Sequence, residues 1–398
     1  MDLRSEHPLW PLRHGLLTVV PPLDADLRCE AVVVGAGITG ALAARRLADA
    51  GVDCAVIDAR DLAQGSTAAS TALLQYDIDV PLVELCEKVG PEHAERAYRA
   101  GVDAIEHLAD LCATLPDCAF ARRPSLYLTR DTDDTEFLRS ELRARRAAGL
   151  DCRWADPAEL ESTYGLTAAG AIHSSVAAEA DPYRLTHHLL RDLIARGVPV
   201  HDRTTLLSLK EHDDAVTLTT DRGVIRARWA VMATGYESVE WLPKKVVSLH
   251  STFAVASEPM PPETAWTDRA LVWEHADPYL YARWTDDHRL LFGGADVPFK
   301  NPAARDALLP QRSEALLKDF TDLWPGHPIE PAFAWAGTFG STKDGLGYIG
   351  APKGRDRVLF ALGFGGNGIT YSEIASRIIA DTVGGRAHPD ADLFSFDR

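Results

Sequence analysis

The sequence predicts an α/β fold in which a Rossmann-like nucleotide-binding domain is interrupted by a second domain. Near the start, a β-branched strand, a glycine-rich turn and a helical pattern run from Glu30 to Leu47, and a second strand, Cys54–Ile57, follows. The apolar segment Ser125–Thr129 then lies between two helical stretches and indicates a strand of another domain. Later segments have the two-residue apolar period of an antiparallel sheet.

Composition excludes several classes of protein. The chain has 398 residues, of which 46% are hydrophobic and 25% charged, as in ordinary folded proteins and unlike disordered or fibrous ones. A net charge of −17 repels phosphate polyanions, so we expect no nucleic-acid partner. No run of about 20 apolar residues is present, so we expect no membrane span.

The six cysteines and the N-terminal segment bear on the compartment. The cysteines show no CxxC pair and no spacing typical of metal ligands, so we expect reduced thiols and no metal site. The apolar run from Gly15 to Val20 stops at two prolines and is too short for the core of a signal peptide. We therefore expect a cytoplasmic protein.

The first motif is the dinucleotide-binding fingerprint Gly35-x-Gly37-x-x-Gly40 between strand and helix. Gly35 permits the tight turn, Gly37 lets the backbone approach a pyrophosphate, and Gly40 lets the helix pack on the strand. Asp58 stands 18 positions after the third glycine, at the end of the second strand, where it would bind the ribose hydroxyls of an adenosine. The alternative is a glycine-rich turn without a ligand, and the flanking strands favour the fingerprint.

A run of small and hydroxyl residues, Gln64–Thr71, follows the second strand. Such a run suits a chain that passes close to a bulky planar cofactor, with Ser66 and Ser70 free to bond phosphate or flavin. A flexible surface loop is the alternative.

The middle of the chain supplies helices and a hairpin. Helical patterns cover Arg96–Leu111 and Thr135–Ala148, and Asp181 with Pro182 has the N-cap and N1 pattern of a helix that continues to Arg196. A hairpin is expected over Ala215–Arg228, and it leads into a buried strand that ends in Ala233-Thr234-Gly235.

Further along, the segments beginning at Phe253, Tyr279 and Arg289 alternate with a period of two. In the second of them, Tyr279, Tyr281 and Arg283 share one face of the strand. One face of this strand therefore carries two phenols and a guanidinium, and a solvated face of an exposed strand is one interpretation of it.

Near the C-terminus a strand meets a helix through Gly363-Phe-Gly-Gly-Asn-Gly368. Ile369, Ile374 and Ile378 mark the buried stripe of that helix, and its N-terminus faces whatever lies at the strand end. An anion or an electron-rich ring is expected there, whereas a tight turn without a ligand is the alternative.

Together these motifs resemble the FAD-dependent D-amino acid oxidase family, which includes glycine oxidase, sarcosine oxidase and γ-glutamylputrescine oxidase. The resemblance follows the family order along nearly the whole chain. Its carriers are Val34–Gly40, Gly65–Ser70, Asp181–Leu185, Ala233–Gly235, Arg289–Gly294, Trp335–Gly337, Asp344-Gly345, Ile349-Gly350 and Gly363–Gly368.

The resemblance implies an FAD-binding domain assembled from discontinuous segments (30–85, 150–238 and 335–386) and an α+β substrate domain (86–149 and 239–334) whose antiparallel sheet covers the flavin. Residues 1–29 would form an N-terminal extension and 387–398 a C-terminal tail. Tyr279, Tyr281 and Arg283 would act as catalytic residues, with Arg283 binding a substrate carboxylate. The cofactor-binding residues would be Gly35, Gly37, Ile38, Thr39, Gly40, Asp58, Ala59, Arg60, Gly65, Ser66, Thr67, Ser70, Thr71, Ala233, Thr234, Gly235, Gly365, Gly366, Asn367, Gly368, Ile369 and Thr370.

The sequence departs from the family pattern in three places. The segment from Gly337 to Asp344 lacks the cysteine through which sarcosine oxidases attach FAD, so we expect a noncovalent flavin. Leu291 stands where those oxidases place an oxygen-activating lysine, which puts fast reaction with O2 in doubt. Lys343 precedes Asp344-Gly345 in place of a proline, so the shape of that loop is open.

The function expected from these observations is oxidation of the C–N bond of an amine or amino acid by hydride transfer to flavin N5. The resulting imine hydrolyses, and O2 reoxidises the flavin. Two alternatives stay open: an FAD dehydrogenase of an amino acid or 2-hydroxy compound that passes electrons to another carrier, and a noncatalytic flavin-binding subunit of a hetero-oligomeric oxidase. The sequence leaves open the substrate, the oligomeric state and whether His250 or Lys343 lines the pocket.

Overall fold

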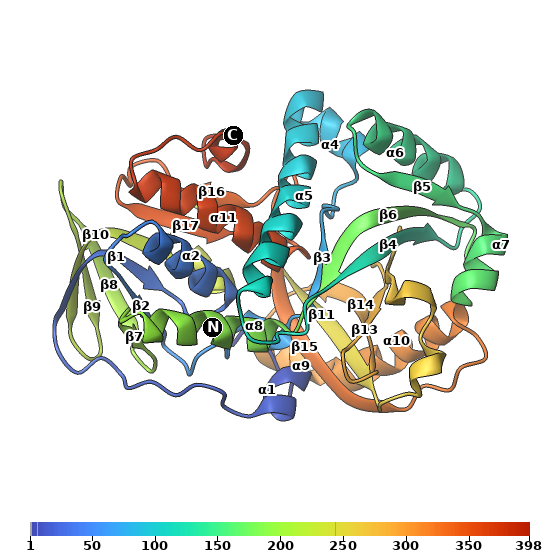
Figure 1. Ribbon diagram of the computed structural model, residues 1–398, viewed down its shortest axis with the longest axis horizontal. Coiled ribbons are helices and arrows are strands. Elements are labelled where there is room, and N and C mark those ends of the chain that lie inside the picture. Colours follow the sequence, from blue (N-terminus) through green and yellow to red (C-terminus); the bar gives the residue numbers. More distant parts are fainter. Residues whose placement is uncertain (1, 6, 243) are drawn as a thin grey trace.

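The computed structural model describes residues 2–5, 7–242 and 244–398. Its strands form two sheets that stand side by side, and the long helix α5 (Pro91–Ala113) lies between them (Figure 1). None of the described helices has both the length and the apolar character needed to cross a membrane.

The first sheet is the nucleotide-binding one. Its described strands are β1 (Leu27–Val34), β2 (Cys54–Ile57), β7 (Val200–His201), β8 (Leu206–Glu211), β9 (Val216–Thr220), β10 (Val224–Met232), β16 (Tyr348–Gly350) and β17 (Val358–Leu362). The order is β16-β17-β10-β1-β2-β7, and the strands from β17 to β7 run parallel. The carboxyl ends of β1, β2 and β10 therefore meet at one edge, where such sheets bind ligands.

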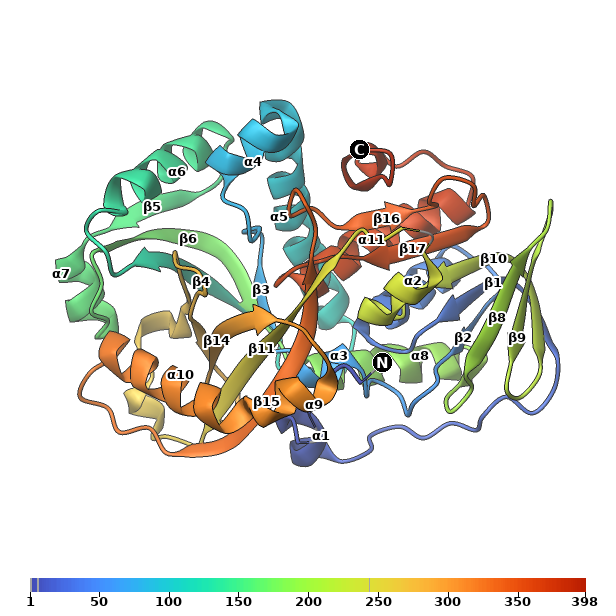
Figure 2. The ribbon, with the colours of Figure 1, turned by 180° about the vertical axis from the view of Figure 1, so that it is seen from behind.

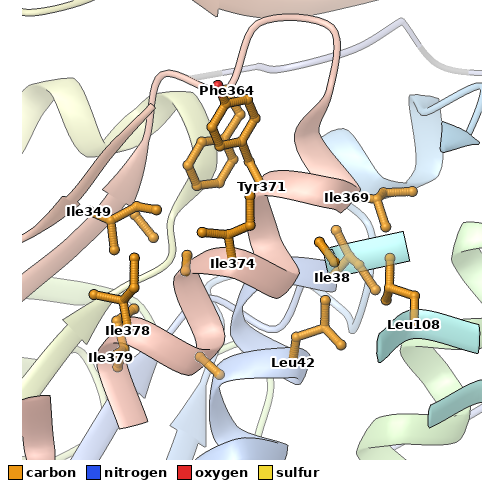
Figure 3. Packing of buried hydrophobic residues seen from close by; sticks show 14 of the residues in the cluster. Ile38, Leu42, Leu108, Ile349, Phe364, Ile369, Tyr371, Ile374, Ile378 and Ile379 are labelled. Carbon is orange, nitrogen blue, oxygen red and sulfur yellow. The ribbon is translucent and has the colours of Figure 1, made fainter. Parts of the chain in front are cut away.

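Helices α2 (Ile38–Asp49), α8 (Pro182–Ala195) and α11 (Gly368–Val383) cover one face of this sheet. The predicted stripe of α11 is confirmed: Ile369, Ile374 and Ile378 are buried, and Figure 3 shows them in the packing between α11 and α2. Burying an isoleucine contributes about 1.5–3 kcal/mol, so this packing fixes the N-terminal ends of both helices relative to the sheet.

The second sheet is larger and has nine described strands. Its described strands are β3 (Leu73–Gln75), β4 (Ala121–Thr129), β5 (Cys152–Ala155), β6 (Gly170–Glu179), β11 (Ser248–Ser257), β12 (Leu271–Glu274), β13 (Tyr281–Trp284), β14 (Leu290–Pro298) and β15 (Pro331–Ser341). Strands β11, β13, β14 and β15 pair antiparallel, as predicted, and α10 (Leu309–Leu323) packs on their outer face (Figure 2).

The remaining helices are short or peripheral. They are α1 (Leu9–His14), α3 (Ser66–Ala69), α4 (Leu82–Val89), α6 (Thr135–Ala147), α7 (Pro157–Glu159) and α9 (Pro302–Ala307), with the π-helical segment η1 (Leu160–Tyr164) and the 3-10 segments η2 (Gly235–Trp241), η3 (Pro262–Thr264), η4 (Thr267–Arg269) and η5 (Ala391–Phe394). The predicted cap of α8 is confirmed, because the Asp181 carboxylate accepts the backbone N–H groups of Tyr183 and Arg184.

Sheet membership differs from the predicted domain ranges in three places. The ranges 30–85, 150–238 and 335–386 were expected to belong to the nucleotide-binding domain, but β3, β5, β6 and the end of β15 pair within the second sheet. The reason is that a strand joins the sheet whose edge it reaches, and the order of motifs along the chain does not reveal that pairing.

Candidate functional site

A cavity of about 450 Å³ lies at the carboxyl ends of β1, β2 and β10 and extends to the inner face of the second sheet. The predicted cofactor-binding residues line it, except Gly40 and Thr370. Segments that are far apart in the sequence therefore meet in one place.

The fingerprint glycines occupy positions that a side chain would block. Gly35 has φ +112°, and a Cβ there would collide with the carbonyl oxygen of Ala233. A Cβ on Gly40 would collide with the carbonyl oxygen of Gly35, so Gly40 lies behind the cavity and permits the close approach of α2 to β1. At Gly37, a Cβ would stand 3.0 Å from the hydroxyl of Thr67, at the cavity wall.

Asp58 follows β2 at the same edge. Its carboxylate accepts the backbone N–H groups of Ala36 at 2.6 Å and Arg60 at 2.8 Å. Burial raises the pKa of Asp58, and these two hydrogen bonds oppose the shift. Arg60 pairs with Glu237 at 2.8 Å beside it, so the one described arginine in the lining belongs to this end of the cavity.

The small-residue run forms a turn with three consecutive carbonyls held by buried donors. The indole N–H groups of Trp335 and Trp10 donate to Ala69 at 2.9 Å and Ser70 at 2.7 Å. The guanidinium of Arg283 donates to the next carbonyl, Thr71, at 2.6 Å. Three distant parts of the chain, including the N-terminal extension, therefore fix this wall of the cavity.

Arg283 requires a correction. The predicted alternation holds, because Leu280, Ala282 and Trp284 pack in the outer core while Tyr279 and Tyr281 line the cavity. Arg283, however, is absent from the lining, and besides Thr71 it donates to the carbonyls of Ala180 at 2.8 Å and Trp284 at 3.1 Å. Its guanidinium is committed to the backbone, so the geometry gives it a positioning role and does not bring it to a substrate carboxylate.

The opposite wall is a segment that the sequence analysis missed. Gln75, Asp77 and Asp79 line the cavity and lie alongside the N-terminus of α11. The Thr370 hydroxyl donates to the carbonyl of Gln75 at 3.1 Å, and the Asn367 side chain donates to the carbonyl of Asp77 at 2.5 Å.

Two contacts complete this wall. The Gly366 N–H donates to the Asp79 carboxylate at 2.7 Å. The Asp77 carboxylate pairs with the buried Arg145, which also bonds Glu141 at 2.7 Å. The polar face of the segment is thus tied to α11 on one side and to α6 on the other.

A sequence signal for this segment exists. Gln75, Asp77 and Asp79 are polar at every second position, and the intervening Tyr76 and Ile78 are buried in the main core. The period of two indicates one polar and one apolar face. Trp273 and Thr252 also line the cavity and were missed, because single residues on separate strands show no pattern. His250 and Lys343 are outside the lining.

The residues fit FAD. The hydroxyl of Ser66 and the amide nitrogen of Gln75 are buried at the cavity and lack a hydrogen-bond partner within the described part of the protein. Buried polar atoms are normally paired, so both indicate a polar ligand. Residues at the N-termini of α2 and α11 line the same space, and the positive ends of these two helices suit a pyrophosphate and a flavin ring.

Comparisons with known proteins agree with this geometry. Residues 30–382 match the model of the DAO family, described as FAD dependent oxidoreductase. Glycine oxidase of Bacillus licheniformis is 25% identical over 370 residues, covering 89% of this chain and 93% of that protein. Gamma-glutamylputrescine oxidoreductase of Escherichia coli is 24% identical over 401 residues, covering 92% and 86%.

Among solved structures, glycine oxidase from Geobacillus kaustophilus has the same fold, with a TM-score of 0.78 at 20% identity, covering 94% of this chain and 99% of that one. The family match spans both sheets and the cavity-lining residues from Val34 to Ile369. The chain therefore belongs to the DAO family of FAD-dependent oxidoreductases.

Proposed function

We propose that the protein oxidises the carbon–nitrogen bond of an amine or amino acid. A C–H bond next to the nitrogen breaks, a C=N bond forms, and water hydrolyses the resulting imine. Bound FAD supplies the acceptor for the two electrons and the hydrogen that leave the carbon. The observation that carries the proposal is the joining of a dinucleotide cradle and an aromatic wall of the second sheet in one cavity.

The chain's own residues bind the cofactor and shape the reaction space. Gly35, Gly37 and Asp58 would hold the adenosine and pyrophosphate portion, and Ser66 would bond an acceptor with its unpartnered hydroxyl. The positive, N-terminal end of α11 would lie toward the electron-accepting part of the flavin. A fixed dipole of this kind stabilises developing negative charge without reorganisation.

Tyr279, Tyr281 and Trp273 exclude water from the substrate end. Burial raises the pKa of Tyr281 to about 12, so its hydroxyl stays protonated and serves as a donor at neutral pH. A bound amine would be held between these rings and the turn before α11. Orientation of this kind lowers the barrier because the reacting atoms are already aligned.

We further propose that FAD is noncovalent. The lining residues include no cysteine among those described, and the segment 337–344 has none in its sequence. Acid precipitation of the yellow holoprotein should release all of the colour into the supernatant. Flavin retained in the washed pellet would contradict this.

Electron transfer to a carrier other than O2 is the second candidate. Leu291 is fully buried and packs with Trp10 and Trp335, away from the cavity lining. Besides Arg60 at the Asp58 end, the described lining contains no Lys, Arg or His. A superoxide anion formed beside the flavin would therefore lack a stabilising cation, which favours a dehydrogenase.

The test is anaerobic reduction of the purified holoprotein by candidate amines and amino acids, followed by air. Bleaching of the flavin absorbance supports C–N oxidation, and a protein that no candidate bleaches, although dithionite reduces it, would instead support a noncatalytic flavin-binding subunit. Slow recolouring in air with fast recolouring by a quinone or dye would identify a dehydrogenase. Rapid recolouring with stoichiometric hydrogen peroxide would identify an oxidase.

A further inference from the structure

The substrate end of the cavity combines carboxylates with aromatic rings. We propose, resting on the proposed C–N oxidation, that the substrate is a diamine-like compound without a carboxylate, whose second, cationic group binds between Asp79 and the rings of Trp273, Tyr279 and Tyr281. The recognised group is an ammonium ion, and the carbon oxidised is next to the other nitrogen.

Asp79 supplies the negative charge. It is an exposed residue of the cavity lining, and desolvation of its carboxyl group by the surrounding protein raises the pKa of that group. Within the described residues, the Gly366 N–H donates to its Oδ2 atom at 2.7 Å. The carboxylate therefore keeps acceptor capacity toward the cavity, since an ionised carboxylate has about four lone-pair sites.

The aromatic rings stand next to this carboxylate. A Cβ on Gly366 would be 2.9 Å from both Asp79 Oδ1 and the Tyr279 hydroxyl, so the two oxygens are neighbours over the same glycine. The Tyr279 ring is 6.0 Å from the Tyr281 ring and 6.4 Å from the Trp273 ring, and all three residues line the cavity. A carboxylate beside a group of aromatic rings is an arrangement that can bind an ammonium ion.

A second carboxyl group, that of Asp296, lies beside Thr252 of the cavity lining. Gly294 and Ala295 form an irregularity in β14, after which Ala295 and Val297 pack on the outer core and Asp296 turns toward Thr252 on the cavity side. Its Oδ1 atom is buried without a hydrogen-bond partner within the described residues.

Among the described lining residues, no arginine, lysine or histidine lies at the substrate end of the cavity. Arg60 is paired with Glu237 beside Asp58, and Arg283 is bonded to backbone carbonyls behind the cavity. A substrate carboxylate would have to lose its hydration beside Asp79 without a compensating cation, which strongly disfavours binding. An ammonium ion would instead gain a charge-assisted contact.

The reaction requires different protonation states of the two nitrogens of the substrate. The nitrogen next to the oxidised carbon must have a free lone pair, because a C=N bond forms there. A carboxylate stabilises the protonated form of a bound amine. The group held by Asp79 is therefore not the nitrogen that reacts, and a substrate with two amino groups meets both requirements.

The first experiment compares matched compounds with the holoprotein under anaerobic conditions. 1,4-Diaminobutane and its carboxylated counterpart ornithine differ by one carboxylate, as do 1,5-diaminopentane and lysine. The diamines should reduce the flavin with a kcat/KM at least about 100-fold higher than the amino acids. Faster reduction by either amino acid would overturn the proposal.

The second experiment measures binding without turnover, so that it does not depend on the reaction. Tetramethylammonium and acetate are titrated into the holoprotein by calorimetry. Tetramethylammonium should bind and acetate should not, even if no compound tested reduces the flavin. Acetate binding with no binding of tetramethylammonium would overturn the cation site while leaving C–N oxidation intact.

The variant Asp79→Asn tests whether the negative charge of Asp79 binds the ammonium group. Its amide oxygen can still accept the Gly366 N–H, so the turn before α11 should be preserved. Loss of one charge-assisted contact should weaken tetramethylammonium binding and raise the KM for diamines about 10- to 100-fold, with a smaller effect on kcat and unchanged FAD content. The control Asp214→Asn makes the same charge change at an exposed residue of the β8–β9 turn. Equal effects of the two variants would show that net charge alone is responsible, and would overturn the role of Asp79.

Discussion

Replacing Arg283 with methionine distinguishes a positioning role from direct contact with substrate. The guanidinium donates to the carbonyls of Thr71, Ala180 and Trp284 at 2.6, 2.8 and 3.1 Å, and one of its nitrogens lies 3.6 Å from the Glu179 carboxylate. Burial lowers the pKa of Arg283, and the charge of Glu179 opposes this most strongly. Methionine fills part of the volume but leaves three carbonyls without this donor and removes a positive charge beside Glu179, whose carboxylate keeps its hydrogen bonds from Arg123.

The magnitude follows from these contacts. Removing one partner of a buried ionic network typically costs about 3–5 kcal/mol. For a domain of 150–250 residues, that corresponds to a fall in Tm of about 6–20 °C. The kcat/KM per bound flavin should change less than about tenfold, because Arg283 acts only through the position of Thr71. Lysine should restore a minor part of the Tm, since an ammonium ion cannot reach three divergent carbonyls as a planar guanidinium does.

The assay pairs thermal unfolding with kinetics normalised to flavin content. Arg222→Met, an exposed arginine in the β9–β10 turn, serves as the control and should leave both quantities unchanged. If Arg283 bound a substrate carboxylate, the loss would be about 2–5 kcal/mol of transition-state binding, or about 30-fold to several thousand-fold in kcat/KM. An unchanged Tm combined with such a loss would refute the positioning role.

Three further predictions concern the cofactor cradle and the carboxyl group behind Thr252. Gly37→Val should fold with little bound FAD, because its side chain would meet the Thr67 hydroxyl at the cavity wall; normal flavin content would mean that the fingerprint is only a turn. Ser66→Ala should weaken FAD binding about 3- to 10-fold in titrations of the apoprotein, and unchanged affinity would show that its hydroxyl does not touch the cofactor. Burial and the charges of Asp79 and Asp277 raise the pKa of Asp296 to about 7, with Thr252 opposing. The folded state therefore binds the additional proton between about pH 4 and 7, and stability falls as the pH rises through this window. Asp296→Asn should thus have a higher Tm than the wild type at pH 8 and an equal one near pH 4; the opposite ranking would contradict an uncompensated carboxylate.

The nucleotide half of the fold was predictable because its signals are local. The glycine spacing, the β-branched strand before it and Asp58 all lie within 30 residues, and the backbone geometry that they require is the same wherever the motif occurs. The strand alternation at Tyr279 and Tyr281 was predictable for the same reason. Domain ranges were harder to predict, since β3 belongs to the second sheet only through its pairing with β6, which itself pairs with β4 and β5.

The role of Arg283 shows where such reasoning stops. Alternation placed it correctly on the inner face of β13, but two partners, Thr71 and Ala180, lie 212 and 103 positions away in the chain. Whether a guanidinium on that face meets a ligand or a backbone carbonyl depends on which segment crosses in front of it. The segment Ala69–Thr71 does so here, with its carbonyls turned outward from the cavity and toward Trp335, Trp10 and Arg283.

Because Ala69–Thr71 crosses in front of Arg283, the sign of the charge that lines the substrate end can be read from the structure but could not be predicted from the sequence motifs. With Arg283 screened by Thr71, the nearest lining charge at the turn before α11 is Asp79, held by the Gly366 N–H. A glycine at position 366 is what leaves room for that carboxylate, because a Cβ there would stand 2.9 Å from both Asp79 and Tyr279. Gly366→Ala should therefore displace Asp79 and lower the diamine affinity measured per bound FAD, and this links the glycine-rich turn to the choice of substrate as well as to the cofactor.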